Sequence, residues 1–255
     1  MLPKPISRAA LALTALASAT HARAQQANPQ GWQFSVTPYL WLSGVSGTLE
    51  TPHPSVPSVN ASASFGSILS KLDSIPIMGS AEVRNGPFGV VADIIAISVK
   101  TGIDTRGLLF SGGSAKLSAV IGDAVFAYRV LADPQQSVDL GIGVRAFGIS
   151  TDFTVGSALL PGFSRSPGAS WADPILAVRY HIDLGPKWGL TAYGDIGGGA
   201  SSSFTWQVLG TVDYRVTNAI ILRAGYRHLN FQYSAPRLDA NLTLSGPIIG
   251  ATFRF

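Results

Sequence analysis

The chain has 255 residues and no cysteine, which excludes disulfides, thiol catalysis and cysteine-ligated metals. Charged residues make up 13% of the sequence, against about 25% in an average soluble domain. The formal net charge of +4 is modest, and it gives no indication of a nucleic-acid partner.

The first 24 residues have the pattern of a cleaved secretory signal peptide. Lys4 and Arg8 form a positive start, residues 9–19 are an apolar run too short to span a bilayer, and residues 22–24 form a small-x-small cleavage site. We expect cleavage before Gln25, and the alternative is an ordinary buried helix at the N-terminus. Because the segment holds three basic residues and no acidic one, the mature chain keeps 15 basic and 14 acidic residues, a net charge of +1.

The rest of the sequence repeats a unit of alternating apolar and polar residues that ends in turn residues. No apolar run approaches the roughly 20 residues of a membrane-spanning helix. An exported, apolar chain of this kind is typical of a closed barrel, because lipid accommodates only helices and closed sheets. We predict about ten strands, with eight as the alternative, since bacterial single-chain barrels have even numbers. The predicted strands are residues 32–48, 75–84, 88–101, 114–130, 138–153, 170–182, 188–198, 204–216, 220–233 and 241–255.

The predicted connections differ in length in a regular way. Tight turns follow the second, fourth, sixth and eighth strands, whereas long connections follow the first, third and fifth. The connection at about residues 49–74 is predicted to be an external loop. Short periplasmic turns and longer external loops are the rule in such barrels, so residues 25–255 are predicted to form one outer-membrane barrel domain with both ends in the periplasm. The alternative, a soluble periplasmic β-sandwich, should carry charged residues on its outer face.

Alternation within each strand predicts which side chains face lipid and which face the lumen. In the strand at residues 204–216, Phe204, Trp206 and Val208 share one face, and Thr205 and Gln207 share the other. The same reading places nearly every mid-strand charge in the lumen. The predicted lumen charge network consists of Glu82, Arg84, Asp93, Asp123, Arg129, Asp139, Arg145, Asp173, Arg179, Asp195, Asp213, Arg215, Arg223 and Arg227.

The charges of this lumen are nearly balanced when Arg254 is added, with seven acids against eight arginines. An unpaired charge in a narrow interior is costly, and the arginine fork can bind several carboxylates at once, so we expect a packed network. A selective pore would more naturally carry an excess of one sign along its path. The pattern therefore favours a plugged or very narrow barrel over a wide porin. The alternative is that the charges only stabilise the lumen and say nothing about transport.

Catalytic candidates are few. His228 is the best-placed base, in the outer part of the strand at residues 220–233, and Asp104, Asp152 and Asp239 are possible acids at the external rim. His53 falls in the external loop and His181 near a periplasmic turn. No cluster has metal-ligand spacing, so we expect no metal and no cofactor. A barrel enzyme acting on lipid or peptide through His228 stays an alternative to a non-enzymatic barrel.

Three segments carry a resemblance to known proteins: residues 37–42 (Thr-Pro-Tyr-Leu-Trp-Leu), residues 224–229 (Ala-Gly-Tyr-Arg-His-Leu) and the terminal residues 250–255 (Gly-Ala-Thr-Phe-Arg-Phe). On these the mature chain resembles the small Gram-negative outer-membrane β-barrel proteins of the OmpA-like and OmpW-like group. The resemblance implies an outer-membrane location, contact with outer-membrane lipid, and recognition by the barrel-assembly machinery through the last strand with its terminal Phe255. We expect a non-enzymatic protein, either structural or a narrow, porin-like small-solute channel.

Overall fold

The computed structural model describes residues 31–50, 59–103, 110–157, 163–166, 168–199, 202–235 and 238–255. They form an all-β structure, and the predicted ten-stranded antiparallel barrel is confirmed. The predicted signal peptide lies outside the described residues. The elements are β1 (Trp32–Trp41), β2 (Gly44–Glu50), β3 (Val59–Ala63), α2 (Phe65–Leu69), β4 (Ile77–Asn85), β5 (Phe88–Ile103), β6 (Phe110–Ala132), β7 (Gln136–Ser157), β8 (Phe163–Arg165), β9 (Gly168–Asp183), β10 (Trp188–Gly197), β11 (Ser202–Arg215), β12 (Ile220–Ala235) and β13 (Leu238–Arg254).

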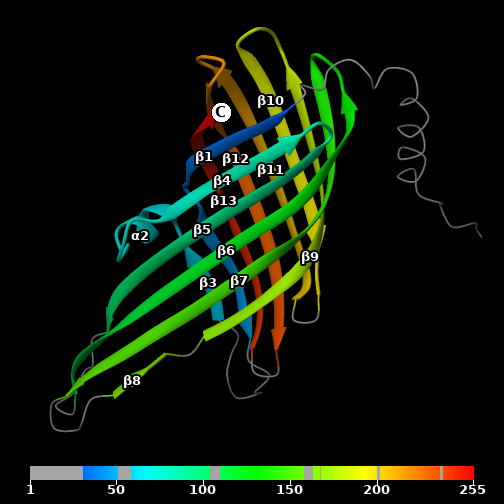
Figure 1. The fold of residues 1–255 in the computed structure, drawn as a ribbon. Helices are drawn as coiled ribbons and strands as arrows, with labels where there is room; N and C mark the ends of the chain where they lie inside the picture. The colour runs from blue at the N-terminus through cyan, green and yellow to red at the C-terminus, as the bar shows by residue number, and fades with distance from the viewer. Residues whose placement is uncertain are drawn as a thin grey trace, which may run out of the picture.

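The barrel closes between its first and last strands (Figure 1). The wall follows the order β1-β4-β5-β6-β7-β9-β10-β11-β12-β13, and β13 pairs back onto β1. In this closing pair Trp41 lies opposite Ile248, and Ser35 lies opposite Arg254. Closure lets neighbouring strands satisfy one another's backbone N–H and C=O groups, which hydrocarbon cannot do.

The short turns and both described ends of the chain lie at the same end of the barrel, the upper end in Figure 1. There the Phe255 N–H donates to the Phe34 carbonyl over 2.9 Å. The turn between β4 and β5 contains Gly86, whose φ of 58° lies in the left-handed region that favours glycine. Short turns mark the periplasmic end of such barrels, so the opposite end faces outward from the cell.

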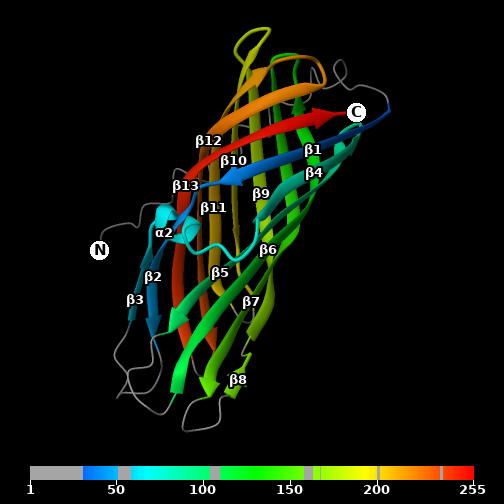
Figure 2. The same cartoon turned by 90° about the vertical axis from the view of Figure 1, so that its left-hand side faces the viewer.

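The first predicted strand is divided in two. Both β1 and β2 pair with β13, but the other edge of β1 pairs with β4 whereas that of β2 pairs with β3. The loop predicted at about residues 49–74 thus contains the strand β3 and the helix α2, which begins after the capping residue Ser64; residues 51–58 lie outside the described part. Figure 2 shows α2 at the side of the barrel, near β2.

The segment after α2 covers the outer edge of β5. The Asp73 N–H donates to the Ser98 carbonyl over 2.9 Å, and the Lys100 N–H donates to the Lys71 carbonyl over 2.8 Å. Lys116 on β6 adds an ion pair of 2.7 Å to Asp73. These contacts attach the segment to the wall at the place where β4 no longer pairs with β5.

The outer surface of the wall is apolar. Large hydrophobic side chains point away from the lumen on successive strands, among them Val90, Phe126, Ile142, Leu176 and Val208. Aromatic pairs form a belt at the periplasmic end, where Phe88 packs on Tyr128 and Trp188 packs on Tyr214. Among the described residues, no helix is long and apolar enough to cross a membrane.

The wall is much taller on one side. β6 has 23 residues and β7 has 22, whereas β4 has nine and β10 has ten. A strand needs only about 9–11 residues to cross the bilayer. The outer halves of β6 and β7 therefore project beyond the membrane on the external side (Figure 1).

Candidate functional site

The lumen of the barrel holds the polar side chains that the alternation of the strands turns inward. They occupy two charge clusters, one nearer the periplasmic turns and one nearer the middle of the wall, and an apolar cluster lies beyond them on the external side. The alternation also explains the contrast with the exterior: Asp139 and Arg145 are buried, whereas Leu140, Ile142 and Val144 between them are exposed.

The cluster nearer the periplasmic turns, and thus nearer the upper end in Figure 1, is called the lower charge cluster here because it lies closest to the periplasm. It consists of Glu82, Arg84, Arg129, Asp139 and Arg179. Asp139 lies opposite Arg129 in the β6–β7 register and opposite Arg179 in the β7–β9 register, so the three side chains meet on one face. Arg129 Nε and Arg179 Nη2 approach Asp139 at 2.8 and 2.7 Å, and Arg84 Nη2 joins them at 2.9 Å. Arg179 also binds Glu82 of β4 at 2.7 Å, four strands away around the wall.

The cluster nearer the middle of the wall, farther from the periplasm, is called the upper charge cluster. It consists of Asp93, Asp123, Arg145, Asp195 and Arg227. Arg145 has no exposed side-chain surface; its Nε lies 2.8 Å from Asp123 and its Nη2 lies 2.7 Å from Asp195. Arg227 of β12 binds Asp93 of β5 at 3.0 Å and approaches Asp123 of β6 at 3.9 Å. Because β12 and β6 are five strands apart in a wall of ten, this last contact joins opposite sides of the barrel.

Neutral polar side chains complete the upper cluster. Tyr39 donates its hydroxyl proton to Asp93 at 3.0 Å and accepts a hydrogen bond from Arg227 at 2.9 Å. Gln207 donates to Asp195 at 3.3 Å and accepts from Arg227 at 2.8 Å. Charge-assisted bonds of this kind are stronger than neutral ones, and here several of them share one guanidinium.

The remaining predicted network residues lie at the edges of these clusters. Asp173 is fully buried opposite Arg145 in the β7–β9 register. Asp213 accepts hydrogen bonds from Thr191 and Thr211, and Arg223 Nε lies 3.6 Å from it. Arg215 does not join the others. It pairs with Asp183 at 3.0 Å beside a periplasmic turn.

An apolar plug closes the lumen on the external side of the upper cluster. It contains Trp41, Phe147, Trp171, Leu229 and Phe231, all of them buried. Phe147 stacks on Trp171 with ring centroids 4.8 Å apart and meets Phe231 at the same distance. Sequence reasoning did not identify this plug. The signal was present, since Phe147 and Leu229 each follow an inward arginine by two residues on the same face.

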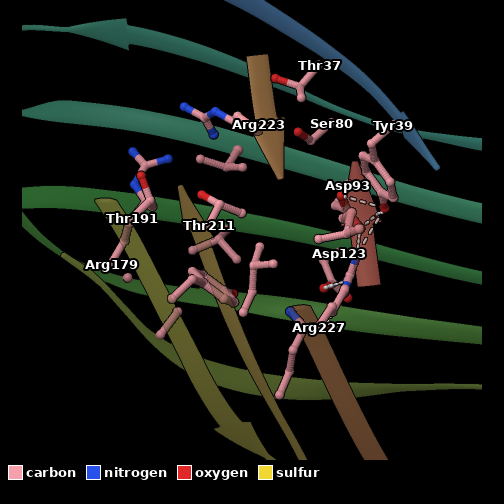
Figure 3. Close-up of a pocket in the computed structure, with 18 of the residues that line it drawn as sticks. Thr37, Tyr39, Ser80, Asp93, Asp123, Arg179, Thr191, Thr211, Arg223 and Arg227 are labelled. Atoms are coloured by element: carbon pink, nitrogen blue, oxygen red, sulfur yellow. Dashed lines mark hydrogen bonds and ion pairs between the residues drawn. The ribbon is translucent and has the colours of Figure 1, made fainter. Parts of the chain in front are cut away.

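Two cavities that share part of their lining lie on the periplasmic side of the plug. The vestibule, of about 440 Å³, opens at the periplasmic end and is lined by Arg179, Thr191, Arg223 and Arg254 among others. An inner cavity of about 140 Å³ shares Arg179, Thr191 and Arg223 with it and extends to Arg227. Figure 3 shows Arg179 and Arg223 at one end of the inner cavity and Asp93, Asp123 and Arg227 at the other.

The proposed catalytic base lies outside the lumen. His228 packs against Trp206 on the outward face, with ring centroids 4.7 Å apart. Of the rim acids, Asp152 lies opposite Lys116 and Asp239 accepts from Ser234 at 2.5 Å, while Asp104 and His53 fall outside the described residues. His181 contacts Thr191 in the vestibule at 2.9 Å. The described part of the chain contains no group of His and acidic residues that could hold a metal ion.

Comparison with known proteins supports the architecture. The sequence matches no protein-family model and no curated protein sequence at a significant level. The structure is similar to the outer membrane protease OmpT from Escherichia coli, with a TM-score of 0.59 and 10% identity over 91% of this chain and 99% of that one. It also matches the Pseudomonas putida toluene transporter TodX, at a TM-score of 0.37 and 8% identity over 89% of this chain and 91% of that one. The translocator domain of the autotransporter NalP from Neisseria meningitidis matches at 0.33 and 12%, over 97% of this chain and 95% of that one.

Of these three matches, the one to OmpT has a TM-score above 0.5, and at 10% identity it bears on the fold alone. The closed ten-stranded wall and its apolar exterior are those of an outer-membrane β-barrel, and that prediction is confirmed. The narrower resemblance to the OmpA-like and OmpW-like group finds no support among these matches.

Proposed function

We propose that this protein is a non-enzymatic outer-membrane barrel whose lumen is occluded by its own side chains. The observation that carries the proposal is the set of ion pairs that cross the bore. Arg179 reaches Glu82 four strands away, and Arg227 reaches Asp123 on the opposite wall. The plug around Trp171 adds a second, apolar barrier. Such a barrel serves as a structural element of the membrane and passes at most very small solutes.

The geometry also argues against a charge-selective pore. Arginines and carboxylates alternate across the bore and neutralise one another, whereas a selective pore needs a ring of one sign along its path. The ion pairs of Arg145, Arg179 and Asp139 are also short, between 2.7 and 2.9 Å. Water and ions passing the lower cluster would have to break these contacts.

Planar-bilayer recording of the refolded protein tests the proposal. We expect no large, stable conductance from the wild type. The charge-neutral double variant Asp93→Ser/Arg227→Ser removes an acid and a base from the bore but leaves the plug in place, so it should stay closed. Only its combination with Trp171→Leu/Phe231→Leu, which weakens the plug as well, should conduct more than the wild type. A large and stable conductance of the wild type would contradict the occluded lumen.

A further inference from the structure

The vestibule carries an excess of arginine. Five arginines line it, namely Arg84, Arg129, Arg179, Arg223 and Arg254, against one acidic side chain, Glu82. Arg84, Arg129 and Arg179 are bound by Glu82 and Asp139 in the lower charge cluster. The excess therefore resides on Arg223 and Arg254.

Arg223 is poorly neutralised. Its Nε lies 3.6 Å from Asp213, too far for a good hydrogen bond, and this buried atom has no hydrogen-bond partner among the described residues. Both carboxylate oxygens of Asp213 already accept from threonines. A buried guanidinium N–H without an acceptor is costly, so the site favours an added oxygen acceptor.

Arg254 adds a second charge at the mouth. It lies on the inward face of β13, two residues after the buried Thr252, and within the described part of the chain it forms no ion pair. The hydroxyl groups of Ser137 and Thr252 line the same vestibule as the two arginines. Planar guanidinium forks with nearby hydroxyls are suited to the oxygens of a phosphate or carboxylate group.

We propose that the vestibule is a binding site for a small oxyanion that enters from the periplasm and is held by Arg223 and Arg254. The ligand class is a solute or headgroup bearing a phosphate or carboxylate. The plug and the upper charge cluster close the far end, so the site is a blind pocket and not a step on a path through the membrane. The inference does not depend on whether the lumen conducts, because binding and conductance are measured separately.

Calorimetric titration of the refolded full-length protein in detergent with inorganic phosphate, at constant ionic strength, tests the site. We expect saturable binding of one phosphate per chain. Arg223→Gln and Arg254→Gln should each weaken it about tenfold or more, because each removes a charged hydrogen bond. Arg223→Lys keeps the charge but loses the fork, and it should fall between wild type and Arg223→Gln.

Lys187→Gln is the matched control, since Lys187 is exposed on a neighbouring periplasmic turn and does not line the vestibule. Its phosphate affinity should equal that of the wild type. Equal weakening in Lys187→Gln and Arg223→Gln would show diffuse charge attraction and overturn the site, as would the absence of saturable binding in the folded wild type. Gel migration without boiling establishes that each variant is folded.

A second arm identifies the source of the oxyanion. The titration is repeated in nanodiscs of phosphatidylcholine alone and of phosphatidylcholine with phosphatidylglycerol. If phosphatidylglycerol weakens the apparent phosphate binding of the wild type but not that of Arg254→Gln, the site is assigned to a lipid headgroup. Equal affinity in both nanodiscs assigns it to a soluble anion, and either result supports the oxyanion site.

Discussion

Arg145 is a buried side chain whose charge is compensated by partners on two other strands. Its guanidinium is fully enclosed, and it is held by two carboxylates, on β6 and on β10. Neither carboxylate has a comparable cation to replace it, because Asp123 is 3.9 Å from Arg227 and Asp195 otherwise accepts from the neutral Gln207. Removing Arg145 would leave two buried negative charges facing each other.

Arg145→Ala should therefore lower the free energy of unfolding by about 3–5 kcal/mol, the usual effect of breaking a buried ion pair from one side. Arg215→Ala is the matched control, because its partner Asp183 lies at a partly exposed turn. That change should cost about 0–1 kcal/mol. Urea unfolding in detergent micelles measures both, and similar losses in the two variants would contradict the buried network.

Gly225 offers a second comparison between single residues. An added Cβ there would collide with the Gly210 carbonyl oxygen and lie 2.8 Å from Thr211 Cα, both of them backbone atoms. Gly225→Ala should destabilise the barrel by about 1–3 kcal/mol, because the wall must shift. Gly210→Ala, on the adjacent strand, meets nothing within 4 Å and should be close to neutral. Urea unfolding in detergent micelles measures both variants. An unchanged free energy of unfolding in Gly225→Ala would show that β11 and β12 can move apart at this point without cost.

At the scale of elements, alternation was enough to predict ten strands, most of them within a few residues of their observed bounds. It underestimated β6 and β7, which run over Phe110–Ala132 and Gln136–Ser157. In the sequence, Gly112 and Gly113 interrupt the alternation at the start of β6. It missed β8, and it left β3 inside a loop, since neither is part of the closed wall. Short strands that pair on one edge carry little periodic signal.

The segment after α2 is an element whose attachment can be tested alone. Lys116 binds Asp73 and holds the pKa of that carboxyl below its usual value, while Asp73 raises the pKa of Lys116. Lys116→Gln should loosen the segment, so that trypsin cleaves after the exposed Lys71 several-fold faster at neutral pH. Lys187→Gln serves as the control, and equal cleavage rates in the two variants would show that Asp73–Lys116 does not hold the segment.

The pH dependence of this attachment follows from the same pair. Because the pKa of Asp73 is lowered in the folded state, its contribution is fully present above the ordinary aspartate range, about pH 4, and is lost as the pH falls through the lowered value. The raised pKa of Lys116 moves the alkaline loss to higher pH in the same way. The segment should thus stay attached throughout the neutral range.

At the scale of the whole molecule, two barriers of different chemistry lie in series along the lumen. The charge balance read from the sequence anticipated polar pairing, but only strand register decides that Asp139 meets Arg129 and Arg179 while Arg215 pairs at a turn. The vestibule was beyond sequence reasoning as well. Its excess positive charge depends on which arginines are neutralised by ion pairs, and the sequence does not tell Arg223 and Arg254 apart from the paired arginines.

The two barriers predict different effects on conductance. In Trp171→Leu/Phe231→Leu the aromatic plug is weakened, but the ion pairs on its periplasmic side still cross the bore. This variant should convert to its unfolded gel form at a lower temperature than the wild type without gaining conductance. A large conductance of this plug variant would show that the plug alone keeps the lumen closed.

The uneven height of the wall also determines which part of the protein is accessible from outside the cell. With a rise of about 3.3 Å per residue, the 22 residues of β7 extend about 70 Å, and roughly half of that length is enough to cross the bilayer. Among the described residues, the paired strands β5, β6 and β7 therefore extend a sheet beyond the membrane on the external side. An antibody or phage that approaches the cell would meet backbone held in register, and recognition there should depend on the folded sheet and be lost on boiling.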